Sequence, residues 1–184
     1  YDNILAVFDN DHVEQGKDKY ITCDVARLGS DKAIVAAWLG WVVVELAVFD
    51  LSKLTKIQQA IFTFRKKYGI PKKNCIADQD GLGSGVVDNC GILGFKNGGR
   101  PIKEWTVNER GVKVLVQPNY ANLKTQCYYH YADKVNEHGV YISCDLQAKH
   151  KEEIIEEHEQ IQSFDTDSDR KIRLKPKEKI IDAL

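Results

Sequence analysis

Hydrophobic and polar positions in the first fifty residues predict three strands. Apolar runs rich in β-branched and aromatic residues occupy residues 20–25, 33–38 and 41–49. Only Leu39 and Gly40 separate the last two runs, so we expect these to form a hairpin. The sequence therefore predicts an antiparallel three-strand start.

The period then changes to that of a helix over residues 51–68. Apolar residues recur there every three or four positions, at Leu54, Ile57, Ile61 and Phe64. Ser52 is the expected N-cap, and Gly69 ends the helix. A short strand at 74–77, ending in Asp78, and a second helix at 86–93 follow.

The second half of the chain has weaker patterning. Dense glycine, asparagine and proline over residues 94–117 predict one strand, at 102–107, and a loop. Residues Leu123, Cys127, Tyr131 and Val135 share one face of an expected helix, capped near Asn119 or Asn122. A short strand at 140–143, a charged helix at 147–162 and a basic strand-like run at 170–177 complete the prediction.

These elements predict an α/β fold with a mixed central sheet flanked by helices. We expect residues 20–184 to form one domain and residues 1–19 to be a linker, because residues 9–19 are polar. The 184 residues contain no methionine, which indicates a fragment or a processed chain.

Composition excludes some classes of function. No apolar run is long enough for a membrane span. The net charge of −1 gives no global reason to expect a nucleic-acid or membrane partner. One local cluster favours DNA, at Arg170, Lys171, Arg173 and Lys175. The alternative interpretation is an edge strand protected by lysines.

The five cysteines are odd in number and widely spaced, with no C-x-x-C pair. We expect reduced thiols. Cys23 and Cys75 lie in predicted strands, where a thiol behaves as a small core hydrophobe.

Two aspartates that end predicted strands are the first candidates for chemistry. Asp24 lies at the end of the strand predicted at 20–25 and opens D-V-A-R-L-G-S-D, while Asp78 follows the strand at 74–77. Either could simply cap a turn. If their strands are neighbours, however, the two carboxylates lie at one edge and repel each other unless a cation lies between them. Magnesium, which prefers hard oxygen ligands, is the natural cation.

The glycines at 81, 83 and 85 have the spacing G-x-G-x-G. This is not the dinucleotide fingerprint, and the chain has no P-loop motif. The favoured interpretation is a tight turn that packs a helix onto a sheet.

Three segments together resemble a known family. Residues 24–31, I-A-D-Q-D-G-L-G-S-G-V-V-D at 76–88 and N-L-K-T-Q-C-Y-Y-H-Y-A-D-K-V at 122–135 are similar to the C-terminal nuclease domain of the large terminase subunit of tailed bacteriophages and prophages. The resemblance covers roughly residues 20–180 and implies a ribonuclease-H-like fold. It also implies that residues 1–19 link to a preceding packaging ATPase.

The resemblance implies a metal-dependent endonuclease that cuts concatemeric phage DNA during packaging. Asp24 and Asp78 match the first two metal-binding carboxylates of the family, with Asp31 as an auxiliary acid. The implied cofactors are two Mg²⁺ or Mn²⁺ ions. The implied partners are double-stranded DNA, the small terminase subunit and the portal, in the cytoplasm of the bacterial host and without a membrane.

The chain departs from the family pattern near its end. The third family carboxylate follows a basic strand and a helix, commonly in a Ser-Pro-Asp context, and here only Asp182 follows the basic run. We expect the third ligand to lie beyond residue 184, with Asp182 as the substitute to test. Two alternatives stay open: a resolvase- or transposase-type nuclease of the same fold, and a non-catalytic DNA-binding or assembly module.

Overall fold

The computed structural model describes residues 1–25, 32–50, 53–80, 82–164 and 171–175. Contacts divide the chain into two compact units. Unit 1 comprises residues 1–96 and 134–147, and unit 2 comprises residues 97–133 and 148–184. The sequence analysis treated residues 20–184 as one domain, and that boundary stays a prediction.

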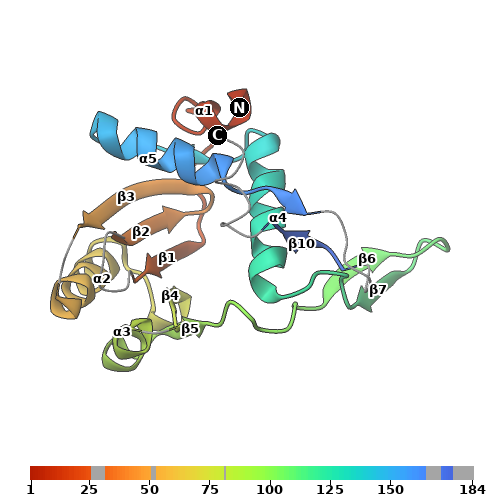
Figure 1. Ribbon diagram of the computed structural model, residues 1–184, viewed down its shortest axis with the longest axis horizontal. Helices are drawn as coiled ribbons and strands as arrows, with labels where there is room; N and C mark the ends of the chain where they lie inside the picture. Colours follow the sequence, from red (N-terminus) through yellow and green to blue (C-terminus); the bar gives the residue numbers. More distant parts are fainter. Residues whose placement is uncertain (26–31, 51–52, 81, 165–170, 176–184) are drawn as a thin grey trace. The chain divides into compact units, whose positions relative to one another are not determined.

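A mixed sheet forms the centre of unit 1, and its described part has six strands in the order β5-β4-β1-β2-β3-β8 (Figure 1). The strands are β1 (Lys19–Asp24), β2 (Ala33–Leu39), β3 (Val42–Phe49), β4 (Cys75–Asp78), β5 (Leu93–Phe95) and β8 (Tyr141–Ile142). Strand β2 pairs antiparallel with both β1 and β3, whereas β4 runs parallel to β1. The predicted antiparallel start and mixed sheet are confirmed.

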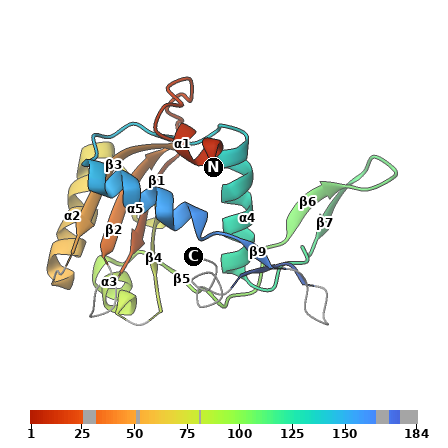
Figure 2. The same cartoon turned by 45° about the horizontal axis from the view of Figure 1, so that its top comes forward.

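Two helices cover one face of this sheet, α2 (Leu54–Tyr68) and α3 (Gly83–Cys90). They lie side by side in Figures 1 and 2. Helix α2 places Ile57, Ile61 and Phe64 in the core, as its period predicts, and it ends at Gly69 with a φ of 66°. The predicted N-cap Ser52 lies outside the described residues.

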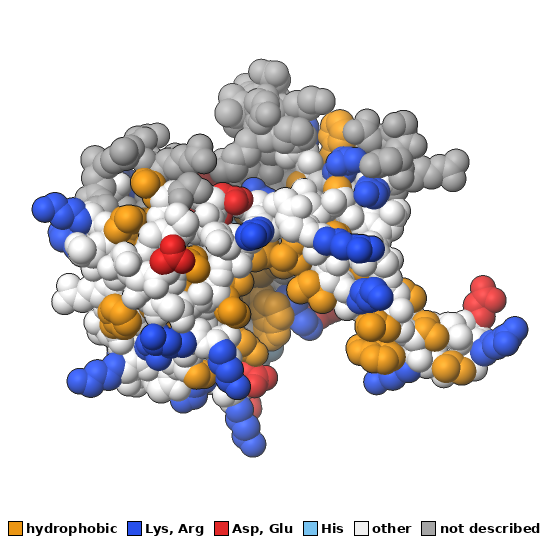
Figure 3. Space-filling view, turned by 90° about the horizontal axis from the view of Figure 1, so that it is seen from below, with side chains coloured by type: hydrophobic (Ala, Val, Ile, Leu, Met, Phe, Trp, Pro, Cys, Tyr) orange, Lys and Arg blue, Asp and Glu red, His pale blue; other side chains and the backbone are white. Residues whose placement is uncertain are grey.

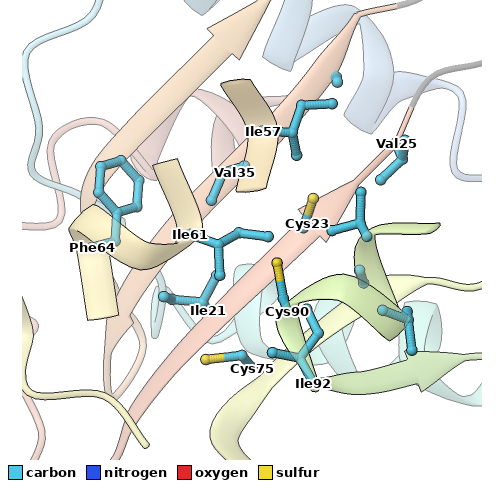
Figure 4. Packing of buried hydrophobic residues seen from close by; sticks show 14 of the residues in the cluster. Ile21, Cys23, Val25, Val35, Ile57, Ile61, Phe64, Cys75, Cys90 and Ile92 are labelled. Atoms are coloured by element: carbon cyan, nitrogen blue, oxygen red, sulfur yellow. The ribbon is translucent and has the colours of Figure 1, made fainter. Parts of the chain in front are cut away.

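The core of unit 1 lies between these helices and alternate residues of the strands. Ile21 and Cys23 of β1 point toward Ile61 of α2 and Cys90 of α3 (Figure 4). Cys75 of β4 lies beside them and is fully buried. Since residues along a strand point alternately to opposite faces, Thr22 and Asp24 belong to the other face of the sheet.

The segment 1–19, expected as a linker, makes contacts within unit 1. Val7, which follows helix α1 (Asp2–Ala6), is fully buried, and its carbonyl accepts a hydrogen bond of 2.7 Å from Ile142 N. The side chain of Asn10 is buried and donates to the Val140 carbonyl at 2.9 Å. A free tether would lack these contacts. Whether the segment links to a preceding domain stays a prediction.

This N-terminal segment also touches the β2–β3 hairpin at two glycines. Gly16 N donates to Leu39 O at 3.1 Å, and Gly40 N donates to Asp18 O at 2.7 Å. A Cβ on Gly40 would lie 2.9 Å from the Cα of Gly16, and the reverse substitution would give 2.8 Å. Neither position has room for a side chain.

Unit 2 contains helix α5 (Ala148–Glu159) and most of helix α4 (Leu123–Asn136), whose last turn belongs to unit 1. It also contains two strand pairs. In one, β6 (Glu104–Val107) pairs with β7 (Lys113–Val116), and in the other, β9 (Ser163–Phe164) pairs with β10 (Arg173–Leu174). The predicted cap of α4 is confirmed at Asn122, whose Oδ1 accepts from the N–H and hydroxyl of Thr125 at 2.8 and 2.9 Å.

Two sequence predictions of secondary structure were wrong. The helix expected to reach residue 93 ends at Cys90, because Gly91 adopts a φ of 60° and caps it, and β5 follows. Residues 108–117, expected as a loop, contain β7, which pairs with β6 through a turn at Asn108–Gly111. Apolar side chains of this hairpin, such as Trp105 and Leu115, are exposed. Hydrophobic side chains, drawn in orange, gather over the hairpin at the right of Figure 3.

Candidate metal centre

Parallel pairing of β1 with β4 brings the two predicted strand-end aspartates next to each other. In the register of these strands Cys23 lies opposite Ala77, so the next pair along the ladder is Asp24 and Asp78. Neighbouring strands lie ~4.8 Å apart, and paired residues point to the same face. Cys23 and Ala77 are buried in the core, so the two carboxylates share the opposite face.

The end of β4 is held by hydrogen bonds at Asp78 and Gln79. Oδ1 of Asp78 accepts from Asp80 N at 2.8 Å, an Asx-turn contact that orients the carboxylate. Gln79 N donates to Phe95 O of β5 at 2.9 Å. Asp80 thus takes part, through its backbone N–H, in the turn that follows β4.

Helix α3 begins directly against Asp78, and Gly83 makes this possible. A Cβ on Gly83 would lie 1.7 Å from the Asp78 carbonyl oxygen, far inside any permitted contact. The sequence analysis interpreted the glycine run as a tight turn that packs a helix on a sheet, and the structure confirms this for Gly83. The glycine allows the strand end and the helix to share one short turn.

The environment below the two aspartates is apolar. Burial, together with the negative charge of neighbouring Asp24 and with Cys90, raises the pKa of the Cys23 thiol to about 12. A thiol with this pKa stays protonated and takes no part in chemistry at neutral pH. The structure therefore places Cys23 in the core, in agreement with the sequence.

The cysteines agree with the prediction of reduced core thiols. All five are free, and Cys23, Cys75 and Cys90 are buried. Burial also raises the pKa of the Cys75 and Cys90 thiols.

The described residues bring together two of the four predicted metal ligands. Asp31 and Asp182 lie outside the described residues, as does Arg170 of the basic run. Within the ranges that the structure describes, no group of three or more His, Cys, Asp or Glu side chains is placed to hold a metal ion. Hard carboxylate oxygens on adjacent strand ends nevertheless fit the preference of Mg²⁺ and Mn²⁺ for oxygen ligands.

The remaining basic candidates lie in unit 2. Lys171 is exposed, and the partly buried Arg173 and Lys175 line a pocket together with Lys124. Lys124, on α4, is far from the basic run in the sequence. Its neighbours in the pocket lie about fifty positions away along the chain, so no local sequence signal could have grouped them.

Comparison with solved structures identifies the fold, whereas no family model and no curated protein matches the chain. A mutant nuclease domain of the large terminase subunit of bacterial virus Sf6, with manganese, has a TM-score of 0.74. Its sequence is 18% identical, over 99% of this chain and 89% of its own. This chain has the fold of a large-terminase nuclease domain.

More distant structures of the same class agree on this terminase-nuclease fold. The large terminase nuclease from thermophilic phage G20c, with bound magnesium, is 14% identical over 89% of this chain and 75% of its own, with a TM-score of 0.53. The human cytomegalovirus terminase nuclease domain is 14% identical over 92% of this chain and 89% of its own, with a TM-score of 0.51. The predicted ribonuclease-H-like fold class is confirmed.

Among the helices that the structure describes, none is both long and apolar enough to cross a bilayer.

Proposed function

We propose that this chain is a metal-dependent endonuclease that cuts concatemeric double-stranded phage DNA during genome packaging. The observation that carries the proposal is the register of β1 with β4, which sets Asp24 and Asp78 side by side on one face of the sheet. The terminase-nuclease fold supports the same conclusion.

Asp24 and Asp78 would hold the cation, and the surrounding structure fixes their positions. Asp24 ends a six-residue strand paired on both sides, and Asp78 is oriented by the Asp80 N–H. When bound, two Mg²⁺ or Mn²⁺ ions supply an activated water and stabilise the leaving oxygen of a phosphodiester. The protein contributes negative charge and rigid placement, with Asp31 as an auxiliary acid and a third ligand at Asp182 or beyond residue 184.

The wider role follows from the same proposal. The chain would act with the small terminase subunit and the portal in the cytoplasm of the bacterial host, where the residues before Lys19 would link it to the packaging ATPase. Arg170, Lys171, Arg173 and Lys175 would contact DNA phosphates without reading base sequence.

Titration with Mn²⁺ and a plasmid-cleavage assay test the proposal together. We expect saturable Mn²⁺ binding and metal-dependent nicking, both lost in Asp24→Asn and Asp78→Asn. The matched control is Asp88→Asn, an exposed carboxylate of α3 that should leave both unchanged. The cleavage arm uses the chain and a form extended past residue 184. Unchanged Mn²⁺ binding in Asp24→Asn would refute the proposed centre.

One observation favours a second candidate. Since the part of the chain described here groups two carboxylates rather than three, a non-catalytic DNA-binding module of the same fold is the alternative. Such a module would bind duplex DNA but show neither saturable Mn²⁺ binding nor cleavage in either form.

A further inference from the structure

Unit 2 contains a pocket that the proposed metal centre does not use. Its volume is about 350 Å³. The lining comes from the start of α4, the end of α5 and the strand β10, and its polar members include Asn122, Lys124, Glu157, Arg173 and Lys175. This volume is at the lower end of the range for small-ligand pockets, roughly 300–1,000 Å³, so a phosphate with an attached sugar would fit.

Positive charge predominates among the described residues of this pocket. Lys124, Arg173 and Lys175 supply three cations, against the single carboxylate of Glu157. All three cationic side chains are partly buried. In a chain with a net charge of −1, such a local excess of cations inside a concave surface favours an anionic ligand.

Backbone hydrogen bonds fix the segments that carry these cations. Ala121 N donates to Ile172 O at 2.9 Å, and Ile172 N donates to Asn119 O at 2.8 Å. Lys175 N donates to Gln162 O at 2.8 Å. The segment that bears Arg173 and Lys175 is thereby tied to the start of α4. The cations converge because of the fold and not because of sequence proximity.

The start of α4 adds a favourable field but no free donors among its first N–H groups. Leu123 N and Lys124 N donate to the carbonyls of Gly99 and Asn97, at 2.7 and 3.3 Å. Thr125 N donates to the Asn122 side chain. A ligand here would therefore be held by side chains, while the positive end of the helix dipole stabilises its negative charge.

We propose that this pocket binds a phosphate group of the DNA backbone, through side chains that take no part in the proposed metal centre. Lys and Arg are the usual protein ligands of phosphate, and Arg can donate two parallel hydrogen bonds. The aromatic ring of Tyr128 lines the pocket, with Lys124 Nζ 5.6 Å from its centroid, so the ring orients the ammonium group. The inference rests on the proposed function, since it assumes that DNA is the substrate.

Duplex binding measured without metal tests this pocket independently of cleavage. Fluorescence anisotropy of a labelled duplex in EDTA is compared for the wild type, Lys124→Ala and Lys175→Gln. We expect each variant to bind about 5–10-fold more weakly, with a salt slope reduced by about one. The matched control is Lys151→Ala, which removes an exposed lysine of α5 outside the pocket and should bind like the wild type.

A competition arm distinguishes a backbone phosphate from a free one. Inorganic phosphate is titrated into the protein with and without duplex. If phosphate binds saturably in a Lys124-dependent manner while duplex affinity is the same in all variants, the pocket is a free-anion site and the proposal fails. Duplex binding by Lys124→Ala and Lys175→Gln at wild-type strength, or a wild type that does not bind duplex, also overturns it.

These outcomes are separable from failure of the nuclease proposal. Loss of DNA binding in the pocket variants of a chain that neither binds Mn²⁺ nor cuts DNA would support the pocket and refute the metal centre. A far-UV circular dichroism spectrum and a thermal midpoint equal to those of the wild type show that Lys124→Ala is folded, whether or not the chain binds Mn²⁺.

Discussion

Replacing Gly83 by alanine tests whether the start of α3 sets the position of Asp78. The added Cβ would lie 1.7 Å from the Asp78 carbonyl oxygen and 2.8 Å from its carbonyl carbon. Cβ contacts under 3.0 Å essentially never occur, so the helix and the strand end must separate by at least about 1.3 Å. Both atoms belong to the backbone, and no rotamer change can relieve the contact.

The expected loss of stability follows from this displacement. Overpacking that moves backbone destabilises a protein by ~3 kcal/mol. In a chain of this size we expect the midpoint of thermal unfolding to fall by roughly 6–12 °C. Since the carbonyl that moves belongs to Asp78, the affinity for Mn²⁺ should fall as well.

Gly85→Ala is the matched control within the same helix. Its Cβ would meet only Leu54 Cδ1, at 3.4 Å, an ordinary contact. Alanine is the better helix former by about 0.5–1 kcal/mol, so this variant should be as stable as the wild type or more so. Calorimetric scans and Mn²⁺ titrations of both variants provide the measurements. Equal melting temperatures for Gly83→Ala and the wild type would refute the close approach of α3 to Asp78.

Three further predictions concern unit 2 and the thiols. The Nδ1 of His158 donates to the Ile154 carbonyl at 2.6 Å, its Nε2 lies 2.7 Å from the Tyr131 hydroxyl, and burial of the ring lowers its pKa. As the pH falls, the unfolded chain therefore binds a proton at this histidine at a higher pH than the folded chain does. The free energy of unfolding should be constant above pH ~6.5 and fall below it. Denaturant midpoints measured from pH 8 to 5 should show this fall in the wild type and lose it in His158→Gln. Asn122→Ala should destabilise the start of α4 by ~1 kcal/mol, measured by urea unfolding, whereas an unchanged midpoint would contradict the cap. Iodoacetamide should label the exposed Cys127 well before the buried Cys23, and mass spectrometry of timed samples would detect the reverse order.

The sequence predicted the central sheet because its signals are local. Residues 20–25, 33–38 and 41–49 form continuous apolar runs, and each became a strand close to the expected bounds. Asp24 and Asp78 were grouped because carboxylates at the ends of neighbouring strands lie at one edge of a sheet, and the register of β1 with β4 makes these two strands neighbours. The ligands Asp31 and Asp182 lie outside the described residues and stay predictions.

The errors arose where glycine and asparagine determine the backbone. Gly91 ends α3 by adopting a left-handed conformation. The apolar residues on both sides of this glycine had suggested that the helix continued to residue 93. Asn108 accepts hydrogen bonds from Arg110 N and Val112 N at 3.0 Å each, which closes the β6–β7 turn. The cation pocket of unit 2 depends on hydrogen bonds between residues about fifty positions apart, and local sequence patterns do not predict such long-range contacts.

The contact between Gly16 and Gly40 has a mechanical consequence. Because the two glycines meet with no room for a side chain and flank two backbone hydrogen bonds, tension applied to the N-terminus reaches the sheet at the β2–β3 hairpin as well as at the first residue of β1. Force would thus be shared between two neighbouring strands instead of peeling β1 away alone. A chain pulled from this end would transmit load through the sheet while the strand that carries Asp24 keeps its register.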